Sequence, residues 1–391
     1  MSPSPAAHRR RSPSMSSARS AVLDNAKYLL ITLVVLGHML RPAPGNQVAM
    51  QGALWVWIYL FHMPAFALIA GHLTGIRPPT ATRYRDLVVR LLIPYLLFNS
   101  FYVVLDRVAL GSGEPFDLTD PYWLTWFLLS LFWWRLLLPV ILQLRYPVAT
   151  SVVISLSAGL VPGFGSQFSA SRTLSMLPFF VLGAVLTRQQ ILWRPPKADR
   201  LLGGLVLVVA FVAAWMLSSS MGLMTDWVSW KESYAAQGLD PLTGLAIRGL
   251  LIGVAVLMTF AFLSVVPRAR TGYTALGAFT IYPYLLHGLV VRGYGATSLP
   301  EASESWIGFM LLVVVGVLLT AALSSGPVRR RTRYVVEPRM RWFMVRDSAP
   351  RHAADGSRRS PDVLDERRYE PVSPVPSDRL DAAVPEAWSS R

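Results

Sequence analysis

Lys27 and His38 are the two residues of the first long apolar stretch whose side chains could do chemistry. Eleven positions separate them in the string LDNAKYLLITLVVLGH. At about 100° and about 1.5 Å per residue, an α-helix returns both side chains to nearly the same face, ~16 Å apart along its axis. Ionisable side chains that face the interior of a helix bundle within a bilayer are costly, and they usually mark a functional path. The spacing therefore predicts an internal path with a cation near one end and an imidazole near the other.

Each of these side chains has a chemical and a structural interpretation. An unperturbed histidine has a pKa of about 6.5, so the neutral ring of His38 can accept a proton from a hydroxyl at physiological pH. The ammonium group of Lys27 suits an anionic ligand such as a phosphate-bearing donor. Alternatively, His38 packs between helices with a bond to a neighbouring backbone, and Lys27 reaches the interface while paired with Asp24. The pair alone leaves both interpretations open.

Composition places the pair in a membrane protein. Apolar residues make up 53% of the 391 residues and charged residues 15%, and long apolar stretches recur along the chain. The chain contains no cysteine, which excludes disulfides, thiolate metal sites and a cysteine nucleophile. The net charge is +15, but Lys and Arg lie beside the apolar stretches and in the two tails. We interpret them as orientation signals and contacts with anionic lipid, and predict no nucleic-acid partner.

These stretches predict an all-α polytopic bundle of about ten transmembrane helices. Connections after every second stretch are rich in Arg and Lys, whereas the others are poorer in basic and richer in acidic residues. The positive-inside rule then puts both termini in the cytoplasm, with Lys27 near the cytoplasmic end of the first helix and His38 toward its outer end. The ten stretches are roughly 21–40, 52–75, 87–106, 122–141, 147–162, 173–188, 201–220, 243–266, 273–292 and 305–325.

The chain divides into a membrane domain and two polar tails. We expect residues 1–20 to be a disordered basic cytoplasmic tail, residues 21–325 to be the transmembrane domain, and residues 326–391 to be a second cytoplasmic tail. The string RYVVEPRMRWFMVR in that tail is expected to lie along the inner leaflet, before a disordered end. The first apolar stretch lacks a small-residue cleavage site and is expected to remain as a helix.

Prolines interrupt three of the predicted spans. Pro64, Pro94 and Pro283 fall inside apolar stretches, where a proline frees a carbonyl and kinks the helix. Two of these spans also carry histidines: His62 and His72, and His287. Such a set would suit the lining of a cavity, although proline is common in membrane helices generally. The chain shows no Gly-rich phosphate loop and no HExxH or DxD-type motif, so no metal site is predicted.

Five motifs, in order along the chain, resemble those of the acyltransferase-3 family of integral membrane O-acyltransferases. In the first-helix signature of that family, a basic residue precedes a catalytic histidine by ten intervening positions, as Lys27 precedes His38 here. Most members carry Arg at the basic position, and Lys27 with Gly37-His38 is similar to the branch of fucose O-acetylases. Where the family usually has a string like SGY, this chain has Ala70-Gly71-His72, so we infer no role for His72. The other four motifs are LFHMPAFALIAGHL, YWLTWFLLSLFWWRLL, SRTLSMLPFFVLGAVL and LGAFTIYPYLLHGLVV.

The resemblance implies an enzyme that moves an acetyl or other short acyl group from acyl-CoA, expected to be acetyl-CoA, to a hydroxyl of a sugar or glycan. It implies that His38 is the general base and that Lys27, with Asp24 and Arg172, contacts the acyl donor. Four further motif residues are candidates for lining the site: His62, Trp126, Tyr284 and His287. Acyl-CoA is then a co-substrate, with no tightly bound cofactor, and the partners are the carbohydrate acceptor and the lipid bilayer.

A multi-pass protein of this kind is expected in the cell membrane, specifically in the inner membrane of a bacterium. The alternative function is a transporter for an anionic or sugar-linked solute, with Lys27 and Arg172 as binding charges and the proline-kinked helices as gates. Transporters usually show paired repeats with broken helices at corresponding positions. The sequence shows no such symmetry, which favours acyl transfer.

Overall fold

Helices make up most of the described part of the chain. The computed structural model describes residues 15–40, 49–76, 80–109, 111, 116–163, 167–191, 195–217, 226–295 and 305–338. These residues belong to a unit that extends to Val345, and a second unit, Arg346–Arg391, lies outside them. Within the described residues every regular element is a helix, and eight segments are long and apolar enough to cross a membrane. The predicted all-α polytopic bundle is therefore confirmed.

Eight of the ten predicted spans are helices of membrane-spanning length. They are α1 (Met15–Met39), α2 (Ala49–Thr74), the continuous α3 (Ala81–Leu87) to α4 (Ile93–Ala109), α5 (Trp126–Ile141), α7 (Ala170–Val185), α9 (Lys197–Met216), α11 (Pro241–Val265) and α14 (Trp306–Leu323). The helix α1 begins at Met15 rather than at residue 21. Two further short helices are α8 (Arg188–Ile191) and α15 (Gly326–Val336).

The remaining two predicted spans form shorter helices. The stretch 147–162 contains α6 (Pro147–Ala158), whose 12 residues extend ~18 Å and so fall short of a hydrocarbon core of about 30 Å. The stretch 273–292 contains a 3₁₀ turn, Leu276–Phe279, followed by α12 (Ile281–Gly295). The part of RYVVEPRMRWFMVR that follows Pro338 lies outside the described residues.

Local sequence explains where several helices begin and bend. Asp240 caps α11, because its carboxylate accepts from the backbone N–H groups of Leu242 and Thr243 at 3.0 Å each. Pro94 has no N–H to offer the carbonyl of Arg90, and the helix widens just before it into a π-helical stretch at Val88–Leu92. Pro283 lies in the first turn of α12, where its missing N–H costs no helical bond. The predicted kink at Pro283 is therefore wrong, because the helix starts there.

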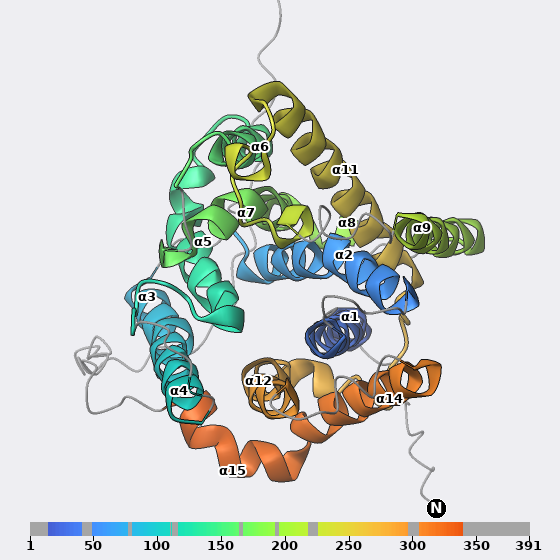
Figure 1. The fold of residues 1–391 in the computed structure, drawn as a ribbon. Helices are drawn as coiled ribbons and strands as arrows, with labels where there is room; N and C mark the ends of the chain where they lie inside the picture. The colour runs from blue at the N-terminus through green and yellow to red at the C-terminus, as the bar shows by residue number, and fades with distance from the viewer. Residues whose placement is uncertain are drawn as a thin grey trace, which may run out of the picture. The chain divides into compact units, whose positions relative to one another are not determined.

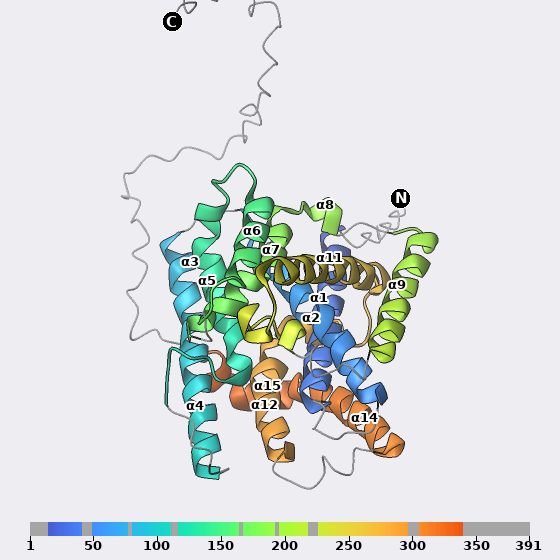
Figure 2. The ribbon, with the colours of Figure 1, turned by 45° about the horizontal axis from the view of Figure 1, so that its top comes forward.

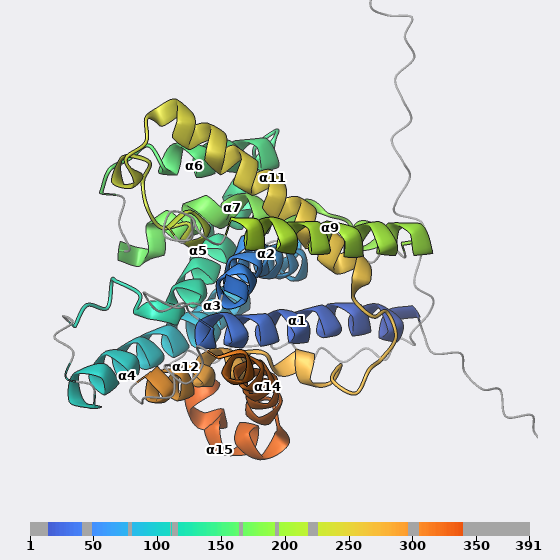
Figure 3. The same ribbon diagram turned by 45° about the vertical axis from the view of Figure 1, so that its right-hand side comes forward.

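The helix α1 lies at the centre of the bundle. It packs against α2, α12, α14 and the 3₁₀ turn Leu276–Phe279. Figures 1 and 3 both show α1 between α2 on one side and α12 with α14 on the other. Figure 2 shows α9 at the opposite edge of the bundle from α3 and α4. Leu201, Leu205 and Val208 of α9 are exposed, as suits a helix that faces lipid.

Two glycines allow α2 and α7 to cross in direct backbone contact. A Cβ atom at Gly71 would lie 1.9 Å from the carbonyl oxygen of Phe180, and one at Gly183 would lie 1.9 Å from that of Leu68. No side chain fits at either position, as at the small-residue crossings common between membrane helices. The Gly71 of the AGH string therefore serves helix packing.

Asn25 attaches the connection between α11 and α12 to α1. Its side chain is completely buried, and Nδ2 donates to the carbonyl oxygens of Pro267 and Ala269 at 2.9 Å each. Oδ1 accepts from the hydroxyl groups of Thr271 and Thr274 at 3.1 and 2.6 Å. All four hydrogen-bonding positions of this amide are thus satisfied.

Candidate active site

His38 lies near the end of α1 in contact with aromatic rings from two other elements. Its ring stacks on Trp123, with centroids 4.9 Å apart and planes 28° apart. On another side, its Nδ1 lies 3.1 Å from Nε2 of His287 on α12. Two of the predicted site residues, His38 and His287, are therefore in direct contact, although 249 positions separate them along the chain.

His287 is completely buried. Its Nδ1 lies 2.7 Å from the carbonyl oxygen of Pro283, one turn earlier in α12. His62 on α2 makes the same kind of local bond, from Nδ1 to the carbonyl oxygen of Ile58 at 2.7 Å, and it is also buried. The ring of His62, however, packs edge-on against Tyr59 rather than against His38. The two histidines thus share a local structure but differ in what their rings face.

Trp123 is a site residue that the sequence did not reveal. It lies in the 3₁₀ turn Trp123–Thr125 before α5 and has φ +49°, in the left-handed region that costs a non-glycine residue about 1–2 kcal/mol. The guanidinium of Arg292 lies 5.0 Å from the centre of the Trp123 ring. The same guanidinium forms an ion pair of 2.9 Å with the buried carboxylate of Asp106, which also accepts from the hydroxyl of Tyr122. This network holds the ring on which His38 stacks.

Lys27 lies in the N-terminal half of α1, where it is partly buried and pairs with Asp24. Their charged atoms lie 2.8 Å apart, and the two side chains are 20% and 25% exposed. The structural interpretation of Lys27, an i, i+3 pair with Asp24, is thus present in the fold. It does not exclude ligand binding, because the ammonium group also borders a cavity.

That cavity, of about 190 Å³, follows the predicted face of α1. Lys27, Ile31 and Val34 line it in succession, and His38 is the next residue on the same face, one turn beyond Val34. Tyr284 lines the cavity from α12, three residues before His287. The walls are otherwise mainly apolar, with side chains from α2, α5, α12 and the π-helical stretch before α4. The cavity therefore runs along the face of α1 that carries Lys27, and His38 lies one turn beyond the last α1 residue that lines it.

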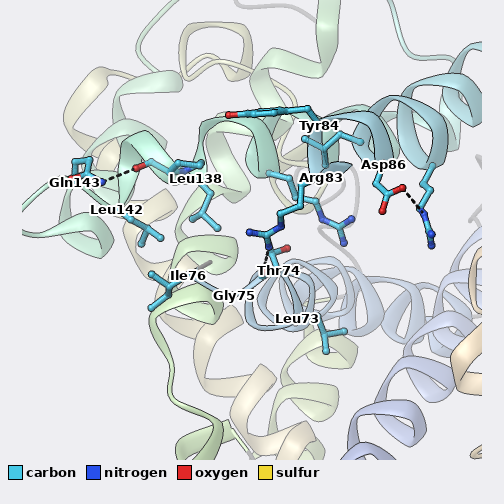
Figure 4. A pocket seen from close by; sticks show the side chains of 14 residues that line it. Leu73, Thr74, Gly75, Ile76, Arg83, Tyr84, Asp86, Leu138, Leu142 and Gln143 are labelled. Carbon is cyan, nitrogen blue, oxygen red and sulfur yellow. Dashed lines mark hydrogen bonds and ion pairs between the residues drawn. The ribbon is translucent and has the colours of Figure 1, made fainter. Parts of the chain in front are cut away.

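A second pocket, of about 540 Å³, adjoins this cavity. It is lined by three arginines, Arg83, Arg90 and Arg135, against one carboxylate, Asp86, which pairs with Arg90 at 3.5 Å. Figure 4 shows the guanidinium of Arg83 turned toward Thr74, to whose carbonyl oxygen it donates at 2.6 Å. Leu73 and Arg135 line both spaces, so the pocket and the cavity share a wall. We call this space the arginine pocket.

Arg172 and Trp126 form a separate group. The guanidinium of Arg172 lies 5.1 Å from the ring centre of Trp126 and donates to the carbonyl oxygen of Ser229 at 3.2 Å. A small hollow beside them is also lined by Ser169, Ser171 and Lys231. Arg172 does not line the cavity that Lys27 borders. The structure thus places Lys27 in the cavity wall and Arg172 outside that wall, within electrostatic reach of Tyr284, which lines the cavity.

Two further residues of the family motifs, Tyr284 and His72, make hydrogen bonds to backbone carbonyl groups. Tyr284 donates its hydroxyl to the carbonyl oxygen of Leu124, directly after Trp123. His72, at the end of α2, has Nδ1 3.2 Å from the carbonyl oxygen of Leu186. Among the residues that the structure describes, no group of three or more His, Asp or Glu side chains is placed to hold a metal ion.

The arrangement can support acid–base chemistry at the end of an apolar passage. An imidazole pair can accept and return a proton. The cationic residues at the other end of the passage can hold a phosphorylated ligand. The apolar walls between them suit an uncharged chain. These are the parts needed to transfer a group from a phosphorylated carrier.

Known proteins support the same conclusion. A family model described as an acyltransferase domain matches residues 21–325. The nodulation protein NolL of Sinorhizobium fredii is 27% identical over 343 residues, which cover 79% of this chain and 87% of that protein. NolL of Mesorhizobium japonicum is 26% identical over 354 residues, which cover 83% and 90%. No solved structure matches. Since the family match spans more than half of the chain and the described residues include eight membrane-length helices, the chain belongs to the acyltransferase-3 family and is a membrane acyltransferase.

Proposed function

We propose that the protein moves an acetyl or other short acyl group from acyl-CoA to a hydroxyl of a sugar or glycan, with His38 as the general base. The observation that carries this proposal is the cavity along one face of α1, lined by Lys27, Ile31 and Val34, with His38 one turn beyond Val34 on the same face. It supports a donor whose charged end stays with the cations while its acyl end reaches the imidazole.

The donor fits the two adjoining spaces in one orientation. The phosphates of CoA lie in the arginine pocket, where Arg83, Arg90 and Arg135 outnumber the single carboxylate. The Tyr84 side chain, 43% exposed at this pocket, offers a face for the adenine ring. The pantetheine arm leaves the arginine pocket beside Leu73 and Arg135, which line both spaces, and then runs along the apolar cavity beside Lys27. By the charge bias of the connections, this end of the bundle faces the cytoplasm, where acyl-CoA is available.

The chemistry takes place beside His38. Its neutral imidazole removes the proton from the acceptor hydroxyl as the oxygen attacks the thioester carbonyl. The carbon–sulfur bond then breaks, the acyl group stays on the acceptor oxygen, and the departing thiolate takes the proton from the imidazolium. The acceptor approaches from the outer side, where Arg172 and Trp126 border the small hollow. Both NolL relatives come from bacteria, which supports the inner membrane as the location.

The experiment compares the wild-type chain with His38→Ala and a matched control. We expect bacteria that express the wild-type chain to show added O-acetyl groups on surface or secreted glycans by mass spectrometry, and His38→Ala to show none. The control is His72→Gln, since His72 lies on α2 and lines neither the cavity nor the arginine pocket. Equal acetylation in wild type and His38→Ala would contradict the proposal. Solute uptake that persists in both, without any acetyl transfer, would favour the transporter.

A further inference from the structure

The contact between His38 and His287 assigns a proton to each ring. Nδ1 of His287 lies 2.7 Å from the carbonyl oxygen of Pro283, and a carbonyl can only accept a hydrogen bond. Nδ1 of His287 therefore carries the proton. A neutral imidazole has one N–H, so Nε2 of His287 is an acceptor.

The same reasoning extends across the contact to His38. Nε2 of His287 lies 3.1 Å from Nδ1 of His38, so a hydrogen bond between them requires that Nδ1 of His38 carry the proton. Nε2 of His38 is then the unprotonated, basic nitrogen. The stack on Trp123, at 4.9 Å and 28°, holds the plane of the His38 ring and opposes rotation about Cβ–Cγ that would carry Nδ1 away from His287.

We infer that His287 is a positioning residue that selects the tautomer of His38 in which Nε2 is the base. This inference rests on the proposed function for its consequence, since the base acts on the acceptor hydroxyl. The proton of that hydroxyl goes to Nε2 of His38, and Nδ1–H continues to donate to His287. Because Nε2 of His287 accepts that bond, it stabilises the positive charge that His38 carries until the proton passes to the CoA thiolate. Pro283, His287 and His38 thus form one directed chain of hydrogen bonds.

His62 shows that the local bond alone does not produce this effect. It is buried and bonds to a carbonyl one turn earlier at the same distance of 2.7 Å as His287. Its ring packs edge-on against Tyr59, whereas Nε2 of His287 lies 3.1 Å from Nδ1 of His38. His62 is therefore the matched control, with the same residue type, the same burial and the same local bond.

The first test reads the tautomer directly. The full-length protein, with ¹⁵N-labelled histidine, is placed in lipid nanodiscs at pH 8, and the His38 signals are identified as those missing from His38→Gln. We expect protonated Nδ1 and unprotonated Nε2 at His38 in wild type and in His62→Gln, and a mixture or the reverse in His287→Met. Protonated Nε2 in wild type would overturn the inference, and this measurement stands even if His287→Met fails to fold.

The second test separates positioning from packing. Gln at position 287 offers an amide oxygen near the place of Nε2, whereas Met fills the space without an acceptor. With acetyl-CoA as donor, we expect His287→Met to lower kcat at least about 100-fold with little change in KM, and His287→Gln to recover much of the loss. Equal losses in both variants, or a change in KM alone, would overturn the inference. If His38→Ala retains acetyl transfer, the proposed function fails, while the tautomer measurement still decides the inference.

Discussion

Arg292 of α12 and Asp106 of α4 form an ion pair of 2.9 Å, and the same guanidinium lies over the ring of Trp123. Asp106 is only 2% exposed, and it also accepts from Tyr122. The pair therefore joins two helices and fixes the aromatic ring that stacks on His38. Sequence interpretation assigned no function to Arg292, because a lone arginine at a helix end is usually an interfacial anchor.

Replacing the buried carboxylate should weaken both the fold and the site. We expect Asp106→Asn to lower the free energy of unfolding by about 2 kcal/mol, since it leaves the partly buried guanidinium of Arg292 without its counter-charge. Thermal unfolding in detergent, followed by tryptophan fluorescence, measures the change. The control is Glu232→Gln, whose partner Lys231 is 3.8 Å away and exposed, and it should shift the midpoint very little. Equal shifts in the two variants would contradict a special role for the buried pair.

Removing the cation of Lys27 should weaken donor binding. We expect Lys27→Gln to reduce the affinity for acetyl-CoA roughly tenfold, or about 1.4 kcal/mol, measured by calorimetry on protein in nanodiscs. Lys27→Arg should retain most of the affinity if only the charge matters, because a guanidinium can still contact donor phosphates or Asp24. Lys231→Gln, a lysine change away from the cavity, should leave the affinity unaltered. An unchanged affinity in Lys27→Gln would remove this residue from the donor site.

Replacing Arg172, unlike replacing Lys27, should leave donor binding unchanged. Because it lies against Trp126 and does not line the cavity beside Lys27, we expect Arg172→Met to leave the affinity for acetyl-CoA unchanged. The same variant should lower O-acetyl transfer to glycans about tenfold, since it removes a charged group from the acceptor side. Calorimetry with acetyl-CoA and mass spectrometry of the glycans check the two halves separately. A reduced donor affinity would instead place Arg172 with the donor.

The crossing of α2 and α7 should not tolerate a methyl group. At Gly71, a Cβ would lie 1.9 Å from a backbone oxygen, so we expect Gly71→Ala to force the helices apart and to lower the yield of folded protein severalfold. Gly249 of α11 has open space around the same position, and Gly249→Ala should fold normally. Size-exclusion chromatography after detergent extraction compares the two. Normal folding of Gly71→Ala would contradict the close contact.

The absence of cysteine makes the predicted topology directly testable. A single cysteine at position 46 should react with a membrane-impermeant maleimide from the outer side of intact cells. A cysteine at Leu144, 43% exposed after α5, should react only after the membrane is opened. The wild-type chain, which has no thiol, gives the blank. The reverse labelling pattern would invert the orientation and place His38 on the cytoplasmic side.

Much of the central helix could be predicted from the sequence. Helical periodicity put Lys27 and His38 on one face, and both residues lie in the single helix α1, whose residues Lys27, Ile31 and Val34 line the cavity. Apolar length predicted ten membrane segments, of which eight are helices of membrane-spanning length among the described residues, whereas α6 and α12 are shorter than predicted. These helices are short because their apolar stretches include turns and a 3₁₀ segment, which hydrophobicity alone does not distinguish.

The rest of the site depends on tertiary contacts that no local pattern encodes. The family motifs drew attention to His287, but not to its bond with His38, because that bond joins α1 and α12. Trp123 was missed because a left-handed residue before a helix gives no signal in an aromatic-rich segment. Asp106 was also missed, since an acid near a helix end looks solvated until its burial is known.

Asn25 fixes the position of α12 along α1, on which the contact between His38 and His287 depends. By binding residues 267 to 274, it fixes the position from which the chain enters the turn before α12, and Gly277 in that turn packs on the backbone of Asp24. A slip of one residue would move α12 along α1 by about 1.5 Å and turn it by about 100°, which would break the contact between two nitrogens that now lie 3.1 Å apart. The axial register of α1 and α12 is thus determined by the contacts of Asn25, and the contact between His38 and His287 depends on it at the other end of α1. Asn25 lies two residues before Lys27 and thirteen before His38, and it thereby aligns the proposed proton path.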